Sequence, residues 1–226
     1  MNFLILGRGK TGSLVADVAR GRKHHVEVIG STENSLMQAL TAEKLAPVNV
    51  VIDFTCPEAA LQNMKACIGK RKNIVVGTTG WYDQLPAVRA LVKQHDTGFL
   101  YGSNFSVGVN LFLQIAKAAA AAMQQGYTGQ IFERHHVHKK DAPSGTALTL
   151  QTTIAEESGV NLEITSFREG EVVGMHEVVF DSTNDNIYLC HDAKSRRGFA
   201  DGAIRAAEWL AGKRGFYEFK DVWREL

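Results

Sequence analysis

The sequence predicts an α/β protein of two lobes, in which the first lobe alternates strands and helices and the second is α+β. Short runs of β-branched residues alternate with helical periodicity through the first hundred residues, which is typical of parallel strands joined by crossover helices. After about residue 105 a long helical stretch leads to apolar runs separated only by short turns, which favours a mixed or antiparallel sheet. The length of 226 residues accommodates one large domain or two modest ones.

The first lobe is expected to contain a parallel sheet with helices on both of its faces. Its buried strands are predicted at residues 2–6, 26–30, 48–54, 74–77 and 98–101. One helix start is marked by three residues: Thr55 can cap it, Pro57 suits the first turn and Glu58 can complete a capping box.

The second lobe begins with a predicted helix over 109–125, a strand over 130–137 and a helix from about Pro143. Further strands are predicted at 162–167, 172–180 and 187–191, and a last helix over 203–210 returns to the first lobe. Hinges are expected near Ser103–Asn104 and Asp201–Gly202. The predicted domains are therefore 1–104 with 202–226, and 105–201.

Composition excludes several classes of protein. There are 25 Lys and Arg against 24 Asp and Glu, a formal net charge of +1, whereas a general nucleic-acid binder needs a cationic excess. Cys56, Cys67 and Cys190 are scattered without a CxxC spacing, which favours a reducing cytoplasm over secretion. The opening apolar run stops at Gly7, too early for a signal peptide or membrane span. We expect a cytoplasmic protein without nucleic-acid or membrane partners.

A glycine-rich turn directly after the first strand carries the first functional prediction. Residues 7–12 read G-x-G-x-x-G and open a helix. The first glycine permits a tight turn, the second lets the backbone approach a pyrophosphate, and the third allows close helix–strand packing. A flexible glycine loop is the alternative, but the strand–turn–helix context favours a Rossmann-like dinucleotide-binding domain over 1–104 and 202–226. The predicted cofactor contacts here are Gly7, Arg8, Gly9, Lys10, Thr11 and Gly12.

The second strand bears on cofactor preference. An NAD site usually carries Asp or Glu at the end of this strand, yet the chain has Gly30 and Ser31 there, and Glu33 follows a little late. Arg8 and Lys10 flank the glycine turn instead, and Ser31 can donate to a phosphate. We predict that NADPH is used at least as well as NADH. The alternative is that the two cations are simply solvated.

A cluster of histidines and cations lies between residues 133 and 147. It holds three of the eight histidines together with Arg134, Lys139 and Lys140. Nearby cations lower the pKa of a histidine and so help to place it for proton transfer near neutral pH. A zinc site is disfavoured because the spacing is not HExxH, no cysteine or close carboxylate completes a ligand set, and the cations would repel a metal. A solvated basic surface is the remaining alternative.

The residues after the cluster favour an anion pocket. Pro143-Ser144-Gly145-Thr146-Ala147 indicates a loop entering a helix, where amides and hydroxyls can hold a carboxylate. Together with a dinucleotide-binding lobe, this indicates hydride transfer to a small carboxylated substrate.

Residues 133–147 closely resemble the signature of the 4-hydroxy-tetrahydrodipicolinate reductase (dihydrodipicolinate reductase) family. The resemblance extends over nearly the whole chain, through residues 7–12, 53–55, 76–80, 104–110, 168–170 and 199–203. The chain is similar to a shortened member, mainly because the stretch between Arg168 and Phe180 is compact.

The resemblance implies a role for each matching residue. His135 matches the family's general acid/base and Lys139 its proton donor. His136, Gly145 and Thr146 match positions that bind a substrate carboxylate. Two further loops match those that line the cofactor, formed by Gly77, Thr78 and Thr79 and by Gly102, Ser103, Asn104 and Phe105. The resemblance also implies a homotetramer associating through the second-lobe sheet of a substrate-binding and oligomerisation domain (105–201); a dimer is the alternative.

The implied reaction reduces 4-hydroxy-tetrahydrodipicolinate to tetrahydrodipicolinate with NADPH or NADH, in diaminopimelate and lysine biosynthesis. Loss of water from this cyclic dicarboxylate gives a conjugated system that accepts hydride at C4, and Lys139 or a nearby acid protonates the resulting enamine.

Two competing functions remain open at this point. Another two-lobed nicotinamide dehydrogenase, of the aspartate or homoserine type, shares the first lobe but gives no reason for the histidine–lysine cluster. A non-catalytic NAD(P)-sensing protein needs the cofactor site but not His135 and Lys139.

Overall fold

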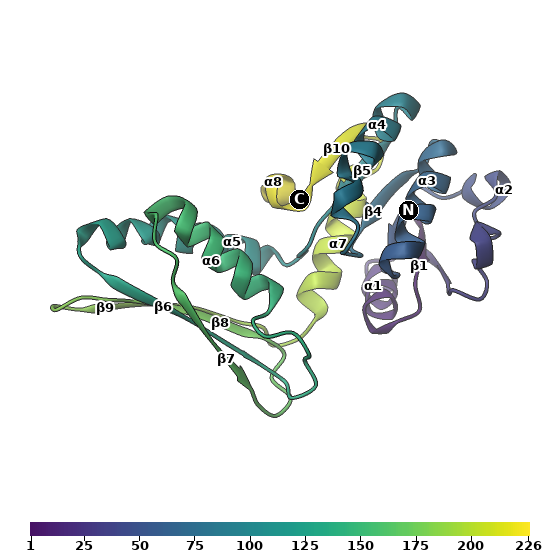
Figure 1. The fold of residues 1–226 in the computed structure, drawn as a ribbon. Helices are drawn as coiled ribbons and strands as arrows, with labels where there is room; N and C mark the ends of the chain where they lie inside the picture. The colour runs from purple at the N-terminus through teal and green to yellow at the C-terminus, as the bar shows by residue number, and fades with distance from the viewer. The chain divides into compact units, whose positions relative to one another are not determined.

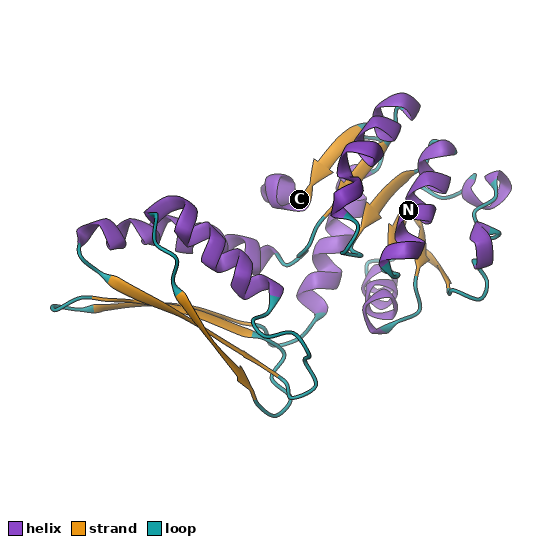
Figure 2. Cartoon of the chain, in the orientation of Figure 1, coloured by secondary structure: helices purple, strands orange, loops and turns teal.

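The computed structural model describes residues 1–226 except for the side chain of Leu36. The chain divides into two compact units, drawn in Figures 1 and 2: Met1–Ser106 with Arg197–Leu226 form unit 1, and Val107–Arg196 form unit 2. The crossings lie at 106/107 and 196/197, where the sequence predicted 104/105 and 201/202. The second differs because the last long helix begins at Arg197 rather than Ala203, so the whole helix belongs to unit 1.

Unit 1 contains a parallel sheet with the strand order β10-β5-β4-β3-β1-β2. Its strands are β1 (Asn2–Leu6), β2 (His25–Ile29), β3 (Val50–Asp53), β4 (Asn73–Val76), β5 (Gly98–Tyr101) and β10 (Gly215–Glu218). The parallel sheet and the first five strands are confirmed, with small differences at their ends. Strand β10 was not predicted, because it is short and only half-buried.

Helices of unit 1 cover both faces of this sheet (Figure 2). They are α1 (Lys10–Gly21), α2 (Ala42–Leu45), α3 (Pro57–Gly69), α4 (Leu85–His95), α7 (Arg197–Leu210) and α8 (Phe219–Val222), with short 3₁₀ turns at Ser35–Met37, Tyr82–Gln84 and Trp223–Glu225. Helices α1 and α7 pack together, and α3 packs on α4. Strands β3 and β4 are wholly buried, as expected for a sheet covered on both faces.

The predicted cap of α3 is wrong. The N-cap is Cys56, which makes no side-chain capping hydrogen bond. The Thr55 hydroxyl instead donates to Asp53 at the end of β3, at 2.7 Å. The hydrogen bond that the Thr55 hydroxyl donates to a carboxylate is stronger than one that it would accept from a neutral helix amide.

Unit 2 contains a mixed sheet with the strand order β7-β6-β8-β9. Its elements are α5 (Val107–Ala119), a 3₁₀ turn (Ala120–Gln125), β6 (Thr128–His135), α6 (Gly145–Ser158), β7 (Glu163–Arg168), β8 (Met175–Asp181) and β9 (Asn186–Asp192). Strands β6 and β7 are parallel because α6 connects them, whereas β8 pairs antiparallel with both β6 and β9. The predicted mixed or antiparallel sheet is confirmed.

Helices α5 and α6 cover one face of the unit 2 sheet. Alternate residues of β6, Ile131, Glu133 and His135, are buried on that face, where the apolar core includes Phe112, Leu150 and Phe180. The strand register places Phe167 and Tyr188 on the other face, which we call the open face. Their side chains are 41% and 62% exposed.

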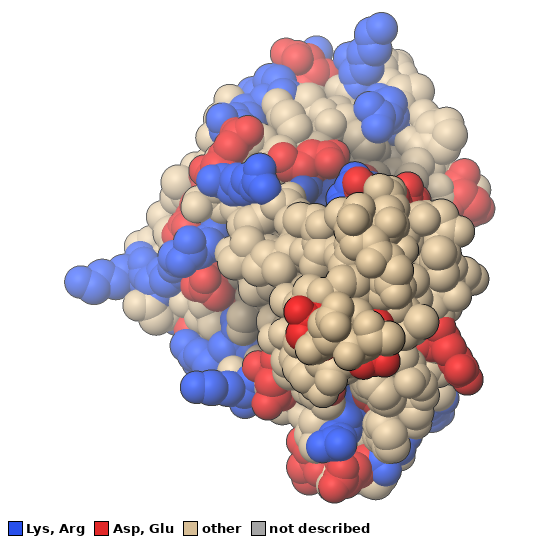
Figure 3. Space-filling model, turned by 90° about the vertical axis from the view of Figure 1, so that its left-hand side faces the viewer, with Lys and Arg blue, Asp and Glu red and all other residues tan. Residues whose placement is uncertain are grey.

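Charged side chains of both signs are spread over the surface (Figure 3). In the view of Figure 3, cationic and anionic side chains surround a broad area that carries few charges. Among the described residues, no helix combines the length and the apolar character needed to cross a membrane. All three cysteines are free thiols, and that of Cys67 is buried.

Candidate cofactor and substrate sites

The glycine-rich turn joins β1 to α1 at the carboxyl edge of the unit 1 sheet. Gly7 has a φ of +107°, a conformation that favours glycine, and its amide donates to Ile29 O at 2.9 Å. Gly9 is the N-cap of α1 and supplies no side-chain cap. No side chain therefore caps the first amides of α1, which lie at the positive end of the helix dipole, as an anion site requires.

Two glycines of the turn are fixed by close backbone contacts. A Cβ on Gly12 would lie 2.0 Å from Gly7 O, and one on Gly7 would lie 2.2 Å from Phe54 O. These contacts pack α1 against the turn, and pack the turn after β1 against the loop after β3. The chain builds the sheet in one direction from β1 to β2 and in the other direction from β3 onward, so the strand order reverses between β1 and β3. Parallel sheets bind ligands at such a point, so the turn fits a dinucleotide.

A pocket of about 290 Å³ opens at the same edge. It is lined by Thr11, Phe54, Thr55, Pro57, Gly77, Thr78 and Thr79, and so brings together four of the predicted cofactor residues. The loop of Gly102, Ser103, Asn104 and Phe105 follows β5, next to β4 in the sheet. Its Phe105 ring packs on Phe54 with centroids 6.1 Å apart.

Asp53, which sequence reasoning did not assign to the site, connects the loops that line this pocket. Its side chain is fully buried, and Oδ1 accepts hydrogen bonds from the hydroxyls of Thr55 and Thr78 at 2.7 and 2.8 Å. Oδ2 accepts from the Asn63 amide at 2.7 Å. Burial raises the pKa of Asp53, and these hydrogen bonds oppose that rise. In the sequence, a role for Asp53 was indicated by its position at the end of an apolar strand.

The end of β2 differs from the sequence prediction. The chain turns back after Gly30, and the Glu33 carboxylate accepts a hydrogen bond from the Gly30 amide at 2.9 Å. An acidic group therefore does stand at the end of β2. Its other oxygen lies 2.5 Å from the Arg8 guanidinium, which also donates to Val28 O at 3.1 Å. Arg8 is thus an ion-paired residue rather than an isolated cation. Lys10 and Ser31 are exposed.

A larger cavity, of about 730 Å³, lies at the opposite edge of the same sheet. Its lining includes Asn2 and His25, at the amino ends of β1 and β2, and the ion pair of Glu27 with Lys44. Ligands of parallel sheets bind at the carboxyl ends of the strands, so we place the cofactor at the smaller pocket.

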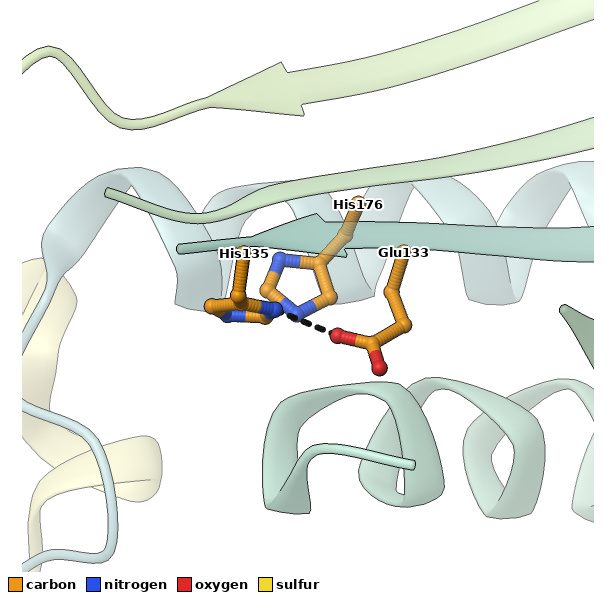
Figure 4. A group of neighbouring side chains, drawn as sticks. All are labelled: Glu133, His135 and His176. Atoms are coloured by element: carbon orange, nitrogen blue, oxygen red, sulfur yellow. Dashed lines mark ion pairs between the residues drawn. The ribbon is translucent and has the colours of Figure 1, made fainter. Parts of the chain in front are cut away.

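His135 ends β6 in unit 2 and contacts a buried carboxylate (Figure 4). Its Nδ1 pairs with Oε2 of Glu133, whose side chain is fully buried. The other oxygen of Glu133 accepts a hydrogen bond from Arg168 Nη2 at 2.8 Å. His176, directly opposite Glu133 on β8, places its ring 5.2 Å from that of His135.

The environment favours the neutral form of both buried histidines. Burial is the largest cause that lowers the pKa of His135, and Lys139 and Arg168 lower it further, whereas Glu133 opposes them. The predicted direction is confirmed, but burial contributes more than the cations. Burial also lowers the pKa of His176 to about 4. Although burial opposes ionisation of Glu133, its pKa is lowered, with Arg168 and His135 among the causes.

Lys139 lies in the loop after β6 and is held by Asp141. Its Nζ lies 2.8 Å from both carboxylate oxygens of Asp141, and this ammonium lowers the pKa of that carboxyl group. Arg168 donates to Asp141 O at 2.5 Å. The sequence analysis did not assign a role to Asp141, although its spacing from Lys139 made the pairing possible.

The start of α6 lies beside the two buried histidines. Ser144 caps the helix by accepting from Ala147 N at 3.2 Å, and its Oγ lies 3.1 Å from His176 Nε2. Gly145 and Thr146 are the first residues of the helix, and a Cβ on Gly145 would meet open space. Ser144, directly before the predicted carboxylate-binding residues Gly145 and Thr146, thus contacts His176, whose ring contacts that of His135.

His136 faces a cation that sequence reasoning missed. Its Nε2 lies 3.1 Å from Arg196 Nη2. Arg196 is exposed and lies far from His136 in the sequence, so no local pattern indicated the contact. A guanidinium beside an imidazole suits a carboxylate ligand.

Glu133, His135 and His176 also form a set of possible metal ligands, with their ligand atoms within 4.8 Å of one another. The sequence argument that no close carboxylate completes such a set is therefore wrong, because alternate strand residues share a face. However, Arg168 occupies one oxygen of Glu133 and Lys139 adds positive charge nearby. We assign no metal to this set.

Comparisons with known proteins match both units to the same family. The family model described as "Dihydrodipicolinate reductase, N-terminus" matches residues 1–105, and the model for its C-terminus matches residues 108–223. A 4-hydroxy-tetrahydrodipicolinate reductase of Christiangramia forsetii is 36% identical, over 100% of this chain and 99% of its own length. One from Neisseria meningitidis is 39% identical, over 79% of this chain and 73% of its own.

Solved structures share the fold. A dipicolinate-bound dihydrodipicolinate reductase from Paenisporosarcina sp. TG-14 has a TM-score of 0.81 and 23% identity, covering 98% of this chain and 99% of its own. Aspartate dehydrogenase from Thermotoga maritima has a TM-score of 0.51 and 13% identity, with coverage of 94% and 97%. The fold alone therefore extends to enzymes with other substrates.

Proposed function

The chain belongs to the dihydrodipicolinate reductase family, and from this premise we propose which of its residues perform the family's reaction. It reduces 4-hydroxy-tetrahydrodipicolinate to tetrahydrodipicolinate, with loss of water, in diaminopimelate and lysine biosynthesis, and it is an NAD(P)H-dependent oxidoreductase. An aspartate or homoserine dehydrogenase and a cofactor sensor are both disfavoured, because the family models match residues of both units.

We assign cofactor binding to unit 1. The pyrophosphate binds at the turn of residues 7–12, because Gly7 and Gly12 leave no room for a side chain and no side chain caps the first amides of α1. The loop of residues 77–79 lines the adjacent pocket. We assign the loop of residues 102–105 to the same site because it follows β5, the strand next to β4. The bound nicotinamide supplies a hydride to the substrate.

We assign proton transfer to His135 and Lys139 in unit 2. His135 is buried, which lowers its pKa and favours the neutral imidazole, and it lies next to the carboxylate of Glu133; a neutral imidazole suits a group that accepts a proton. Lys139 carries the ammonium that protonates the reduced substrate. The observation that carries this proposal is the juxtaposition of His135 with Glu133 and, through His176, with the start of α6.

The substrate carboxylates bind around the start of α6. Gly145 and Thr146 offer helix amides, and His136 with Arg196 offers a cationic partner. Two such sites suit a dicarboxylate, because the carboxylates are fixed while the ring between them reacts.

The experiment that tests these roles follows NADPH absorbance after addition of the substrate, and NADPH binding by fluorescence. His135→Gln and Lys139→Ala should each lower kcat by about 10²-fold or more, with the Kd for NADPH within about twofold of the wild type because the cofactor residues belong to unit 1. If both variants retain wild-type turnover, the catalytic assignment is wrong.

We also propose that the enzyme is a cytoplasmic homotetramer. Tyr188 and Phe167 expose large apolar surfaces on the open face of the unit 2 sheet, which is the kind of surface that subunit association covers. Three free thiols suit a reducing compartment.

A further inference from the structure

We propose that Glu133 is a positioning residue for His135: it accepts the Nδ1 proton of the imidazole and so leaves Nε2 as the nitrogen that exchanges a proton with the substrate. This inference rests on the proposed role of His135 as the acid/base. The sequence analysis gave Glu133 no role, and the reaction as described above does not specify which imidazole nitrogen reacts.

Glu133 is held facing His135. The two residues are separated by one position on β6, so their side chains leave the same face of the sheet. Oε2 contacts Nδ1 of His135, while Oε1 accepts from Arg168 Nη2 at 2.8 Å. The carboxylate is fully buried, with a hydrogen bond from Arg168 at Oε1 and the close contact with His135 at Oε2, so it limits the orientations open to the ring.

Gly174 lies on the other side of the His135 ring, next to Nε2. A Cβ on Gly174 would lie 2.9 Å from His135 Nε2, so any side chain at this position would crowd that nitrogen. Glycine at this position avoids that contact. The ring of His176 stands at 73° to that of His135 and restricts its rotation.

The protons of the site identify the tautomer of His135. An ionised carboxylate only accepts hydrogen bonds, so Nδ1 must carry a proton to pair with it, and the neutral ring then has an unprotonated Nε2. Arg168 favours the ionised form of Glu133. The charged or titratable groups around His135 are Glu133 on β6, Lys139 in the following loop, Arg168 on β7 and His176 on β8.

The test has a readout that a merely structural role would not move: the tautomer of His135. Enzyme labelled with ¹⁵N-histidine is examined by long-range ¹H–¹⁵N NMR above neutral pH, and the His135 signals are assigned by their loss in His135→Gln. The wild type should show a proton on Nδ1. A proton on Nε2 in the wild type overturns the proposal, whatever the variants do.

The decisive variant is Glu133→Gln. Its amide has one acceptor oxygen, which Arg168 retains, so the amide NH₂ faces Nδ1 and favours the Nε2–H form. We expect this tautomer change, a lower pKa for His135 because an attractive charge is lost, and kcat lower by about tenfold or more. The KM for NADPH should stay within about twofold. An unchanged tautomer and unchanged kcat in folded Glu133→Gln contradict the proposal.

A matched control is Glu171→Gln. Glu171 also pairs with a histidine of unit 2, His138, at 3.9 Å, but both side chains are exposed. The change removes the same charge, and the tautomer of His135 and kcat should remain those of the wild type.

The catalytic role of His135 and the positioning role of Glu133 can be disproved independently of each other. If His135→Gln abolishes turnover while the wild-type ring carries its proton on Nε2, the function holds and the positioning role fails. If His135→Gln retains turnover while the ring carries its proton on Nδ1 and responds to Glu133→Gln, the catalytic assignment fails and the structural inference about the ring stands.

Discussion

The carboxylate of Glu33 lies 2.5 Å from the guanidinium of Arg8, at the carboxyl end of β2. This edge of the sheet is where a Rossmann-like fold meets the ribose of the adenosine. A carboxylate there favours the 2′-hydroxyl of NADH, whereas a guanidinium favours the 2′-phosphate of NADPH. Because the two groups pair with each other, each one limits the preference that the other would give alone, which fits use of either cofactor.

Replacing Glu33 by Gln should shift cofactor preference toward NADPH. The change frees the Arg8 guanidinium and removes a charge that repels the 2′-phosphate. We expect the ratio of kcat/KM for NADPH to that for NADH to rise about tenfold, equivalent to about 1.4 kcal/mol. Glu27→Gln is the control, since Glu27 is on the same strand but pairs with Lys44. Equal ratios in all three proteins would show that Glu33 does not select the cofactor.

Replacing Gly12 by Ala should damage both folding and cofactor binding. The new Cβ would lie 2.0 Å from Gly7 O, and neither backbone can yield without moving α1 from the turn. We expect a loss of about 1–3 kcal/mol in the free energy of unfolding and at least tenfold weaker NADPH binding, measured by urea unfolding and fluorescence titration. Gly21→Ala, also in α1, meets nothing within 4 Å and should leave NADPH binding intact. A wild-type Kd in Gly12→Ala argues against the turn as the pyrophosphate site.

Acidification should destabilise unit 2 through His176. Burial lowers the pKa of His176 from 6.5 to about 4, so between these values the unfolded chain binds a proton that the folded chain does not. The free energy of unfolding therefore falls as the pH is lowered through this window, by about 1.4 kcal/mol per pH unit and about 3 kcal/mol in all.

This prediction is checked by urea unfolding at several pH values and a fixed protomer concentration. His176→Gln should be less sensitive to pH than the wild type, because the glutamine does not titrate. His138→Gln is the control, since His138 is an exposed histidine of the same unit. An identical pH slope in the wild type and His176→Gln would assign the acid sensitivity to other groups.

Replacing Tyr188 by Asp should dissociate the proposed tetramer. Tyr188 is 62% exposed on the open face of the unit 2 sheet, and burying an unpaired carboxylate in an interface is costly. Sedimentation velocity should show smaller species for Tyr188→Asp. Val160→Asp introduces the same charge at a 42% exposed apolar residue in the turn after α6 and should leave the assembly unchanged. A tetramer that persists in Tyr188→Asp would place the interface elsewhere.

Most of the fold could be predicted because its signals are local. The strand at 2–6, the turn at Gly7 and the alternation of unit 1 each follow from adjacent residues. Strand β10 could not be predicted, since four half-buried residues form a strand only because the edge of β5 is available to them. The start of α7 at Arg197 was also missed, because its first residues are mostly polar and small.

The sequence by itself determined the family and the chemistry of the reaction, and it was enough to propose the residues that perform it, because the motif around His135 is contiguous. Only the tertiary structure decided the partners: that Glu33 returns to Arg8, that Arg168 and Glu133 hold the ring of His135, and that His176 joins it to the start of α6. These contacts join residues of different strands and loops. The register between strands and the path of each turn select them, and both depend on packing of the whole unit rather than on any local run of residues.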